Sequence, residues 1–378
     1  MVSSDEPGAS SMAVIRMFTL LRAAFVSAHQ VQAMTLCIAH GCPFVATRAR
    51  TRTHARQSML LVPLLFAVSA PATTPAVNAP AAASRHAGIC DASAGVALDA
   101  RRFVVADDER NTLVIYRTGS PAAVERIDLS VFLGTRQDKE SDIEGAAQVG
   151  QRIYWIASHG LNARGEFQER RHRFFATDVV PGNAASVQPA GRPYTQLLRD
   201  LQRAPSLAHL DLARAGGLAP EAPGGLNIEG LAAAPDGSLL IGFRNPLRQA
   251  RALLVPLLNP DDLLQGRAAR FGMAIELDLG GRGIRSIERV GARYLIVAGP
   301  TGDAGAFALF SWSGRATDRP VASTMSAFGD LRPEALFALK TSGELRALSD
   351  DGGRMIEGKR CKDLPSVRQE FRDTTVRP

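Results

Sequence analysis

A hairpin pattern that recurs along the chain constrains its fold more than any other feature of the sequence. Each copy has a run of alternating apolar residues, a tight turn, and a second apolar run that ends in polar residues. The clearest turn is Pro235-Asp-Gly237, which is typical of a β-hairpin. Successive copies are spaced by roughly 50, 85, 56 and 49 residues, counted from one reference position in each copy. These positions are Ala94, Glu144, Glu229, Arg285 and Glu334.

A hairpin that returns every 40–55 residues, on the order of known blade repeats, predicts an all-β fold of the β-propeller type. Five blades fit the count, and six fit if one copy is degenerate. The repeated hairpin supplies the two inner strands of each blade. Because the chain continues for only 44 residues after Glu334, we expect the last blade to borrow an outer strand from residues 85–90. Further outer strands are expected at residues 113–117, 174–179, 253–257 and 306–312.

The long second interval predicts a helical insertion between the second and third units. Leu197, Leu198 and Leu201 share one face of a helix predicted over residues 192–203, and prolines flank this segment. A second short helix is predicted over residues 207–215. We interpret the leucines as packing residues rather than as a surface that binds a partner.

The N-terminal region has the order of features found in an export signal. Four arginines between positions 48 and 56 precede an apolar stretch from Met59, and small residues suited to cleavage follow it. The sequence divides into a leader (1–58, with an over-extended start and Met34 as a plausible initiator), a signal-peptide core and cleavage site (59–72), a Pro/Ala linker (73–87), the propeller (88–363) and a tail (364–378). We expect export to the periplasm or secretion; the alternative is an uncleaved N-terminal arm.

The formal charge of +7 does not point to nucleic acid. Residues 1–72 hold six arginines against two acidic residues, so more than half of the charge lies in the leader. The rest is spread over the remaining chain with both signs mixed, unlike a nucleic-acid footprint. The apolar stretch of the leader, about twelve residues, falls short of the roughly 20 residues that span a bilayer, so no stable membrane span is expected. The predicted state is a monomer.

Cysteine placement predicts one disulfide. Cys37 and Cys42 lie in the leader, whereas Cys90 and Cys361 lie at the two ends of the predicted propeller. In an exported protein this placement favours a Cys90–Cys361 bond that closes the ring. Two buried free thiols are the alternative.

The candidate site lies at one mouth of the propeller channel. Innermost strands line such a channel, so Glu144, Glu229, Glu334 and Arg285 are expected near a common axis, with His159 and Arg244 at the ends of the returning strands. Crowded carboxylates must be protonated, paired with cations or bound to a metal, and Ca²⁺ or another divalent cation suits such oxygen ligands. Alternatively, the glutamates hold neighbouring blades together. The predicted substrate-binding residues are Asp107, Asp108, Asn245, Arg164 and Asp350.

Several enzyme classes are excluded by missing motifs. The sequence has no Gly-x-Ser-x-Gly elbow, no Walker loop, no His-Glu-x-x-His and no cysteine cluster for zinc. The run Gly280-Gly-Arg-Gly283 lies between strands and is interpreted as a turn.

Five segments resemble a bacterial propeller family catalogued as domain of unknown function 3616. They are Asp142-Ile-Glu-Gly145, residues 154–160, Asn227-Ile-Glu-Gly-Leu-Ala232, Ile241-Gly-Phe-Arg-Asn-Pro246 and Gly283-Ile-Arg-Ser-Ile287, in order between Cys90 and Asp351. The resemblance implies a propeller and no particular activity. A fainter resemblance, through Glu229-Gly-Leu-Ala232, is to exported phytase-like esterase propellers, and it implies phosphoesterase activity.

Two functions are consistent with these features. The first is a metal-assisted hydrolase of phosphoesters or other anionic small molecules, in which Glu144, Glu229 and Glu334 hold a cation, Arg244 and Arg285 clamp negative charge, and His159 transfers a proton. The second is a non-catalytic propeller that presents the same mouth to a ligand or partner protein. The fold alone does not choose between them.

Overall fold

The computed structural model describes residues 83–182, 185–324 and 328–377. The predicted leader, signal peptide, cleavage site and most of the Pro/Ala linker lie outside these residues. Within the described part, no helix has the length and apolar character needed to cross a membrane.

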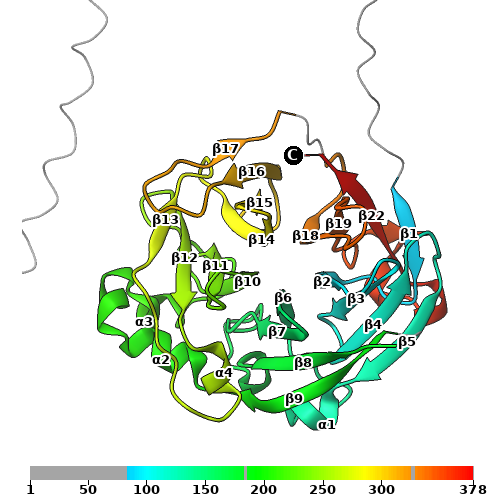
Figure 1. The fold of residues 1–378 in the computed structure, drawn as a ribbon, viewed down its shortest axis with the longest axis horizontal. Coiled ribbons are helices and arrows are strands. Elements are labelled where there is room, and N and C mark those ends of the chain that lie inside the picture. Colours follow the sequence, from blue (N-terminus) through cyan, green and yellow to red (C-terminus); the bar gives the residue numbers. More distant parts are fainter. Residues whose placement is uncertain (1–82, 183–184, 325–327, 378) are drawn as a thin grey trace, which may run out of the picture. The chain divides into compact units, whose positions relative to one another are not determined.

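Five four-stranded antiparallel sheets are arranged around a central axis in the described residues, which confirms the five-bladed propeller (Figure 1). The first blade consists of β2 (Ala92–Ala97), β3 (Arg102–Asp107), β4 (Thr112–Arg117) and β5 (Ala123–Asp128). The second consists of β6 (Ile143–Val149), β7 (Arg152–Ala157), β8 (Phe174–Val180) and β9 (Ser186–Tyr194). The third consists of β10 (Asn227–Ala233), β11 (Leu239–Asn245), β12 (Ala252–Leu257) and β13 (Ile275–Leu277). The fourth is β14 (Gly283–Val290), β15 (Arg293–Gly299), β16 (Ala308–Trp312) and β17 (Val321–Ala322).

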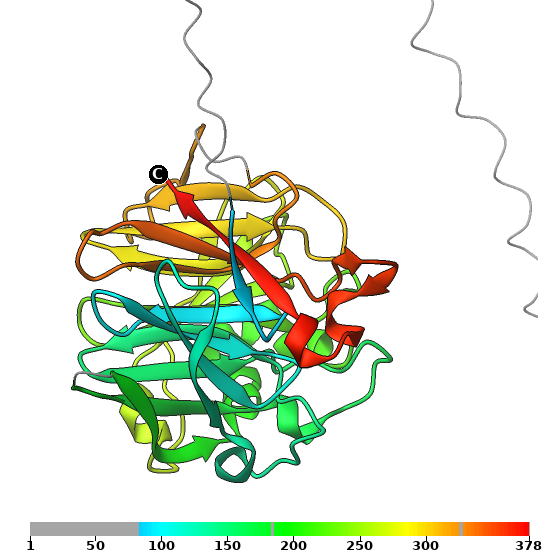
Figure 2. The same cartoon turned by 90° about the vertical axis from the view of Figure 1, so that its right-hand side faces the viewer.

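The fifth blade contains both ends of the described chain. It consists of β18 (Pro333–Ala338), β19 (Leu345–Ser349), β22 (Glu370–Val376) and β1 (Ser84–Ala87). Figure 2 shows β1, in blue, beside β22, in red, and the two strands pair antiparallel from Ser84–Asp373 to Ala87–Glu370. The predicted borrowing of an outer strand is therefore confirmed. The predicted boundaries need correction, because β22 lies in the expected tail and β1 in the expected linker.

Apolar side chains fill the space between neighbouring blades. Five buried clusters are present in the described residues, and each joins two adjacent sheets. The inner strands are buried on both faces, and β3 and β11 are accordingly buried at every position. Gly242 shows how tightly the blades pack: a Cβ there would lie 2.8 Å from a methyl of Ile284 on the next blade.

The helical insertion forms, with shorter helices than the pattern predicts. Strand β9 runs on to Tyr194, so α2 is limited to Leu197–Arg203, and a 3₁₀ helix (Pro205–Leu210) and α3 (Leu212–Ala215) follow. Leu197 and Leu201 are buried in the cluster between blades two and three, and Leu198 packs against it. The leucines are packing residues, as predicted.

The remaining elements are short. They are α1 (Ser130–Leu133), α4 (Pro260–Leu263), the hairpin β20 (Met355–Ile356) and β21 (Lys359–Arg360), and 3₁₀ turns at Glu169–Arg171, Cys361–Asp363 and Ser366–Arg368.

Candidate functional site

The innermost strand of every blade changes register at the same point. The shift leaves one residue of the inner strand without a partner on the second strand, as in a β-bulge. The skipped residues are Ser93, Glu144, Glu229, Arg285 and Glu334. Bulges re-aim side chains, so one repeated backbone irregularity places the candidate residues. In the first blade the equivalent residue is Ser93, one position before the reference residue chosen from the sequence.

Three of these residues form a chain of buried ion pairs across blades three, four and five. Arg285 Nε lies 2.7 Å from Glu229 Oε2, and Arg285 Nη2 is paired with Glu334. All three side chains are buried. A buried arginine between two carboxylates offsets the cost of desolvating them, and removing it would leave two uncompensated charges.

Arg244 extends this chain towards the mouth. Arg244 is the next-to-last residue of β11, and it donates hydrogen bonds to Glu229 Oε1 and to Glu221 Oε1, both at 3.1 Å. Its Nε also donates to the carbonyl of Thr301. Arg244 and Arg285 are thus both paired with protein carboxylates, which does not favour the predicted role of clamping a substrate anion. The same pairing does not favour Glu229 and Glu334 as metal ligands.

Glu144 differs from the other glutamates. It is only 8% exposed, and among the described residues no hydrogen bond or ion pair reaches its carboxylate. Burial, with Glu229 and Asp142 nearby, raises its pKa well above the usual value, although Arg285 and Arg244 act in the opposite direction. A buried carboxyl with a raised pKa at a channel is a candidate for proton transfer.

A second acidic group lies where the first and fifth blades meet. One carboxylate oxygen from each of Asp91, Asp107 and Asp108 lies within 4.8 Å of the others. Burial raises the pKa of Asp91 to about 9, with Asp350 adding to the shift, and raises that of Asp107 to about 7. The sequence indicated Asp107, Asp108 and Asp350 and missed Asp91, which lies outside the repeated hairpins.

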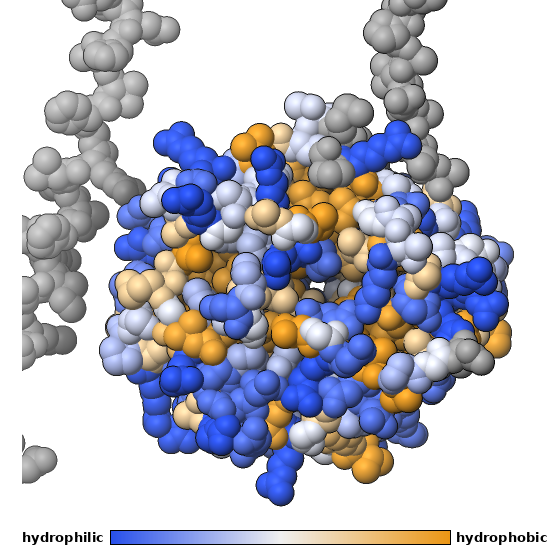
Figure 3. Space-filling view, in the orientation of Figure 1, coloured by the Kyte–Doolittle hydropathy of each residue, from blue (hydrophilic) through white to orange (hydrophobic). Residues whose placement is uncertain are grey.

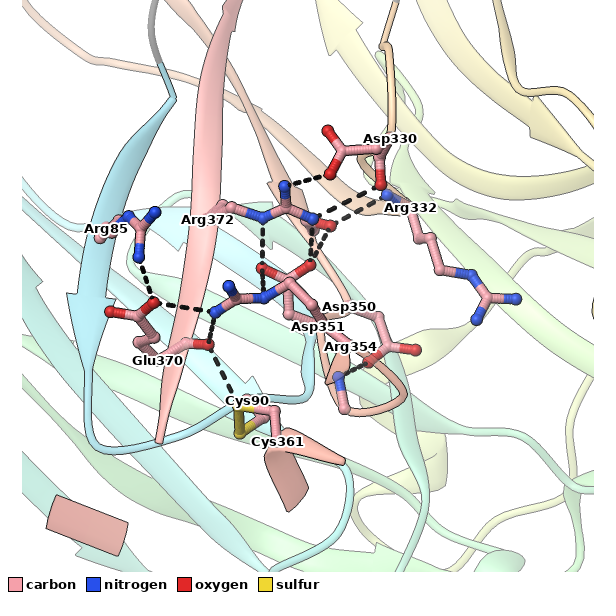
Figure 4. A network of polar contacts seen from close by, with 12 residues as sticks. Arg85, Cys90, Asp330, Arg332, Asp350, Asp351, Arg354, Cys361, Glu370 and Arg372 are labelled. Carbon is pink, nitrogen blue, oxygen red and sulfur yellow. Dashed lines mark hydrogen bonds and ion pairs between the residues drawn. A yellow bond between two sulfur atoms is a disulfide. The ribbon is translucent and has the colours of Figure 1, made fainter. Parts of the chain in front are cut away.

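The disulfide and the ring closure hold this acidic group. Cys90 and Cys361 are bonded, as predicted. Figure 4 shows the bond beside a network in which Arg372 pairs with Asp351 and Asp330, and Glu370 with Arg85 and Arg354. Asp351 donates its backbone N–H to the carbonyl of Cys90, and Asp91 bridges Asp350 through its backbone. The closure therefore sets the position of Asp91.

His159 does not join the glutamates. Its Nδ1 lies 2.7 Å from the carbonyl of Ala157, and its ring meets His172 edge-on at 5.5 Å. Burial and the neighbouring His172 lower the pKa of His159 to about 3. His159 is therefore neutral at pH 7 and packed, and the structure offers no contact that supports its predicted role in proton transfer.

Asn245 and Arg164, which the sequence predicts to bind substrate, lie in different settings. Asn245 is buried and donates to the carbonyls of Pro220 and Ala222, so it fixes the loop before β10. Arg164 is exposed on the loop between β7 and β8, with no side-chain contact to the channel residues. A pocket of about 320 Å³ lies beside this loop, against α2, and is lined by residues that include Phe167, His172 and Leu198.

Besides Asp91, the structure adds two residues that the sequence patterns did not single out. Ser93 Oγ donates to the carbonyl of Ile143 at 2.5 Å and so links the first two blades. Glu221, from the loop before β10, pairs with Arg244. Ser93 could have been found by aligning the first copy one residue earlier, whereas no local pattern marks Glu221.

Figure 3 shows a narrow opening at the centre of the ring, bordered by hydrophilic residues among others. The opening coincides with the inner strands in Figure 1. The site therefore combines one line of paired charges with one group of clustered aspartates.

Comparisons with solved structures show propellers with low similarity. Glutaminyl cyclase of Myxococcus xanthus is 12% identical, covers 78% of this chain and 96% of its own, and has a TM-score of 0.41. A putative oxidoreductase (glucose dehydrogenase) of Thermus thermophilus is 13% identical, with coverage of 78% and 100% and a TM-score of 0.40. The sialidase of Trypanosoma rangeli is 11% identical, with coverage of 68% and 42% and a TM-score of 0.36. These values carry no argument about function.

No protein of curated function matches the sequence. The model of one protein family does match, over residues 183–341, which run from β9 to the inner hairpin of the fifth blade. The fainter resemblance to phytase-like esterases stays a prediction. The resemblance found in the sequence motifs is confirmed over this range: residues 183–341 match the family described as protein of unknown function, DUF3616.

Proposed function

We propose that this chain is an exported hydrolase that acts on phosphoesters or other anionic small molecules at the acidic channel mouth. The observation that carries the proposal is Glu144: a carboxyl that is buried, without a partner among the described residues, and placed on an inner strand of the channel. A carboxyl whose pKa is raised by burial is suited to act as a general acid.

In the proposed reaction, the oxygen of a water molecule bonds to the phosphorus or acyl carbon and the ester bond to the leaving oxygen breaks. Glu144 gives its proton to that leaving oxygen, and the proton lost by the water restores the carboxyl. Arg244 and Arg285 are positioning residues in this scheme, because both are bound to glutamates. Their guanidinium groups hold Glu229 and Glu334 in place through ion pairs.

The cellular setting is part of the proposal. The disulfide between Cys90 and Cys361 persists best in an oxidising compartment, and the order of charge, apolar run and small residues before residue 73 supports export. We therefore propose the periplasm or the extracellular space as the place of action.

The test is a panel of phosphomonoesters, phosphodiesters and carboxylic esters with the purified full chain and its Glu144→Gln variant. Loss of a general acid lowers kcat by about 10²–10⁴-fold. Glu125→Gln, on the exposed outer strand β5, is the matched control and should keep the parental kcat. Circular dichroism must show that both variants fold. Equal kcat for Glu144→Gln and parent would exclude the proposal, and ligand binding without turnover would identify a binding propeller.

A further inference from the structure

Three aspartates converge at the seam of the ring, two from the end of β3 and one from just before β2. Asp107 ends β3, Asp108 follows it, and Asp91 precedes β2 after the disulfide. Their closest oxygens lie within 4.8 Å of one another. Two oxygens bound to one Ca²⁺, at about 2.4 Å each, are at most about 4.8 Å apart, so this separation fits a shared cation.

Of the three aspartates, only Asp107 has an ion pair with a protein cation among the described residues. Asp91 is 5% exposed, and no hydrogen bond or ion pair reaches its carboxylate within the described part of the chain. Asp108 Oδ1 is buried without a hydrogen-bond partner there. The ion pair of Asp107 with Arg110 is long, at 3.4 Å. The nearby Lys362 pairs with Glu109 instead.

Glu144 adds an independent pointer to a ligand. It belongs to the second blade, is 8% exposed and has no partner among the described residues, and it lies close enough to Asp108 to interact with it electrostatically. Buried carboxylates that are neither paired nor hydrogen-bonded are costly, because they have lost water without gaining a substitute. A bound cation supplies that substitute.

We propose that Asp91, Asp107 and Asp108 bind one divalent cation of the Ca²⁺ class at the seam between the first and fifth blades. The ligands are hard carboxylate oxygens, and no histidine takes part. The nearest cysteines, Cys90 and Cys361, are bonded to each other. This chemistry selects Ca²⁺ or a similar hard cation over zinc.

The backbone around the site is shaped to fit Asp91. A Cβ added to Gly352 would lie 1.6 Å from Asp91 Oδ1, so only glycine fits there without displacing the carboxylate. Gly352 donates its N–H to Asp350 Oδ1 at 2.9 Å. The turn at residues 350–352 therefore packs directly against the proposed ligand.

This site differs from the sequence-based prediction, which placed a cation on Glu144, Glu229 and Glu334. Arginines already neutralise two of those three glutamates. The proposed aspartate site also goes beyond the hydrolase proposal, since cation binding does not depend on turnover. If both hold, the bound cation lowers the negative charge that an anionic substrate meets at the mouth.

The test is calorimetric titration of the chelator-treated full chain with CaCl₂, alongside thermal unfolding with and without Ca²⁺. We expect one saturable site and a higher Tm with Ca²⁺. Asp108→Asn should weaken Ca²⁺ binding at least tenfold and abolish the Tm shift, while the metal-free Tm stays equal or rises because one crowded charge is removed. Asp138→Asn, in an exposed loop, is the matched control and should bind as the parent does.

Two further variants keep the test decisive. Asp107→Asn removes a second ligand, and Gly352→Ala displaces Asp91 without changing any charge; both should weaken Ca²⁺ binding. Absence of saturable Ca²⁺ binding by the parent up to millimolar concentration would overturn the proposal, and so would unchanged binding in both Asp107→Asn and Asp108→Asn. The ester panel measures kcat rather than Ca²⁺ binding, so failure of one proposal leaves the other standing.

Discussion

Arg285 supplies the positive charge that two glutamates of the channel wall share. It is buried between Glu229 and Glu334, and its guanidinium also lies 5.5 Å from the ring of Phe307. Breaking a buried pair from one side costs about 3–5 kcal/mol, because the remaining charges stay buried without compensation.

We therefore expect Arg285→Met to lower the free energy of unfolding by about 3–5 kcal/mol in urea titrations. The triple variant Arg285→Met/Glu229→Gln/Glu334→Gln should recover part of this loss, since it removes the buried charges together. Arg289→Met, at an exposed position on the same strand, is the control and should lie within about 0.5 kcal/mol of the parent. A single variant as stable as the control would show that the ion-pair chain contributes little.

His159 and His172 make the domain sensitive to acid. Burial is the main cause that lowers the pKa of His159 to about 3, and the neighbouring His172 and Arg173 lower it further. Burial also lowers the pKa of His172 to about 4, with Arg173 and Arg171 adding to the shift. The ordinary pKa of histidine is near 6.5, so below that pH the unfolded chain binds protons at these two histidines and the folded chain does not. Their contribution to stability is complete above pH 6.5 and is lost as the pH falls towards 4.

In urea titrations from pH 7 to pH 4, the parent should lose stability with a contribution of up to about 1.4 kcal/mol per pH unit from each histidine. His172→Gln should show a shallower dependence, because it removes one of the two groups. His209→Gln, an exposed histidine in the insertion, should follow the parent. Identical slopes for His172→Gln and the parent would contradict the assignment.

At the scale of the element, β22 decides whether the fifth blade closes. Phe371 of this strand is fully buried, and its ring lies 4.9 Å from that of His86 on β1 and 5.3 Å from that of Tyr116 in the first blade. One side chain thus joins the C-terminal strand, the N-terminal strand and the next blade.

We expect Phe371→Ala to lower the free energy of unfolding by about 3–5 kcal/mol, since it removes a large buried side chain and leaves a cavity. Thr374→Ala, three residues on in the same strand and only partly buried, should cost far less. Guanidinium unfolding followed by tryptophan fluorescence would measure both. A loss of less than about 1 kcal/mol for Phe371→Ala would indicate that β22 is not needed for closure.

At the scale of the whole molecule, the disulfide links residues that are 271 positions apart. Cross-linking a loop of this length restricts the unfolded chain by about 5 kcal/mol in the chain-entropy model, less any native strain. The bond joins the start of the first blade to the segment between β19 and β22 of the fifth, so it acts on the ring as a unit.

The double variant Cys90→Ser/Cys361→Ser should therefore unfold at lower temperature and lose about 2–4 kcal/mol. Dithiothreitol should lower the Tm of the parent and leave that of the double variant unchanged. Cys37→Ser/Cys42→Ser keeps the ring bond and serves as the control. A parent whose Tm does not respond to complete reduction would disprove a stabilising role for the disulfide.

The preference for five blades, the inner hairpins, the packing role of the insertion and the favoured disulfide came from the sequence by itself. They rest on local periodicity, turn residues and cysteine placement, all of which can be read directly from the sequence. The tail prediction failed because β22 carries Glu370, Arg372 and Asp373, which reads as a polar segment. In the structure, Asp373 is buried against His86 and Arg346, and only the neighbouring strands supply those partners.

The arrangement of the site residues depended on tertiary structure more than the fold did. The sequence indicated that Glu229, Glu334 and Arg285 meet, since equivalent repeat positions share one place in a ring. It did not show that arginines neutralise two of the glutamates while Glu144 has no partner among the described residues, or that Asp91 joins Asp107 and Asp108. Those facts depend on side-chain direction at five register shifts and on how the first and last blades join. Both are set by contacts between residues far apart in the chain, which local patterns do not encode.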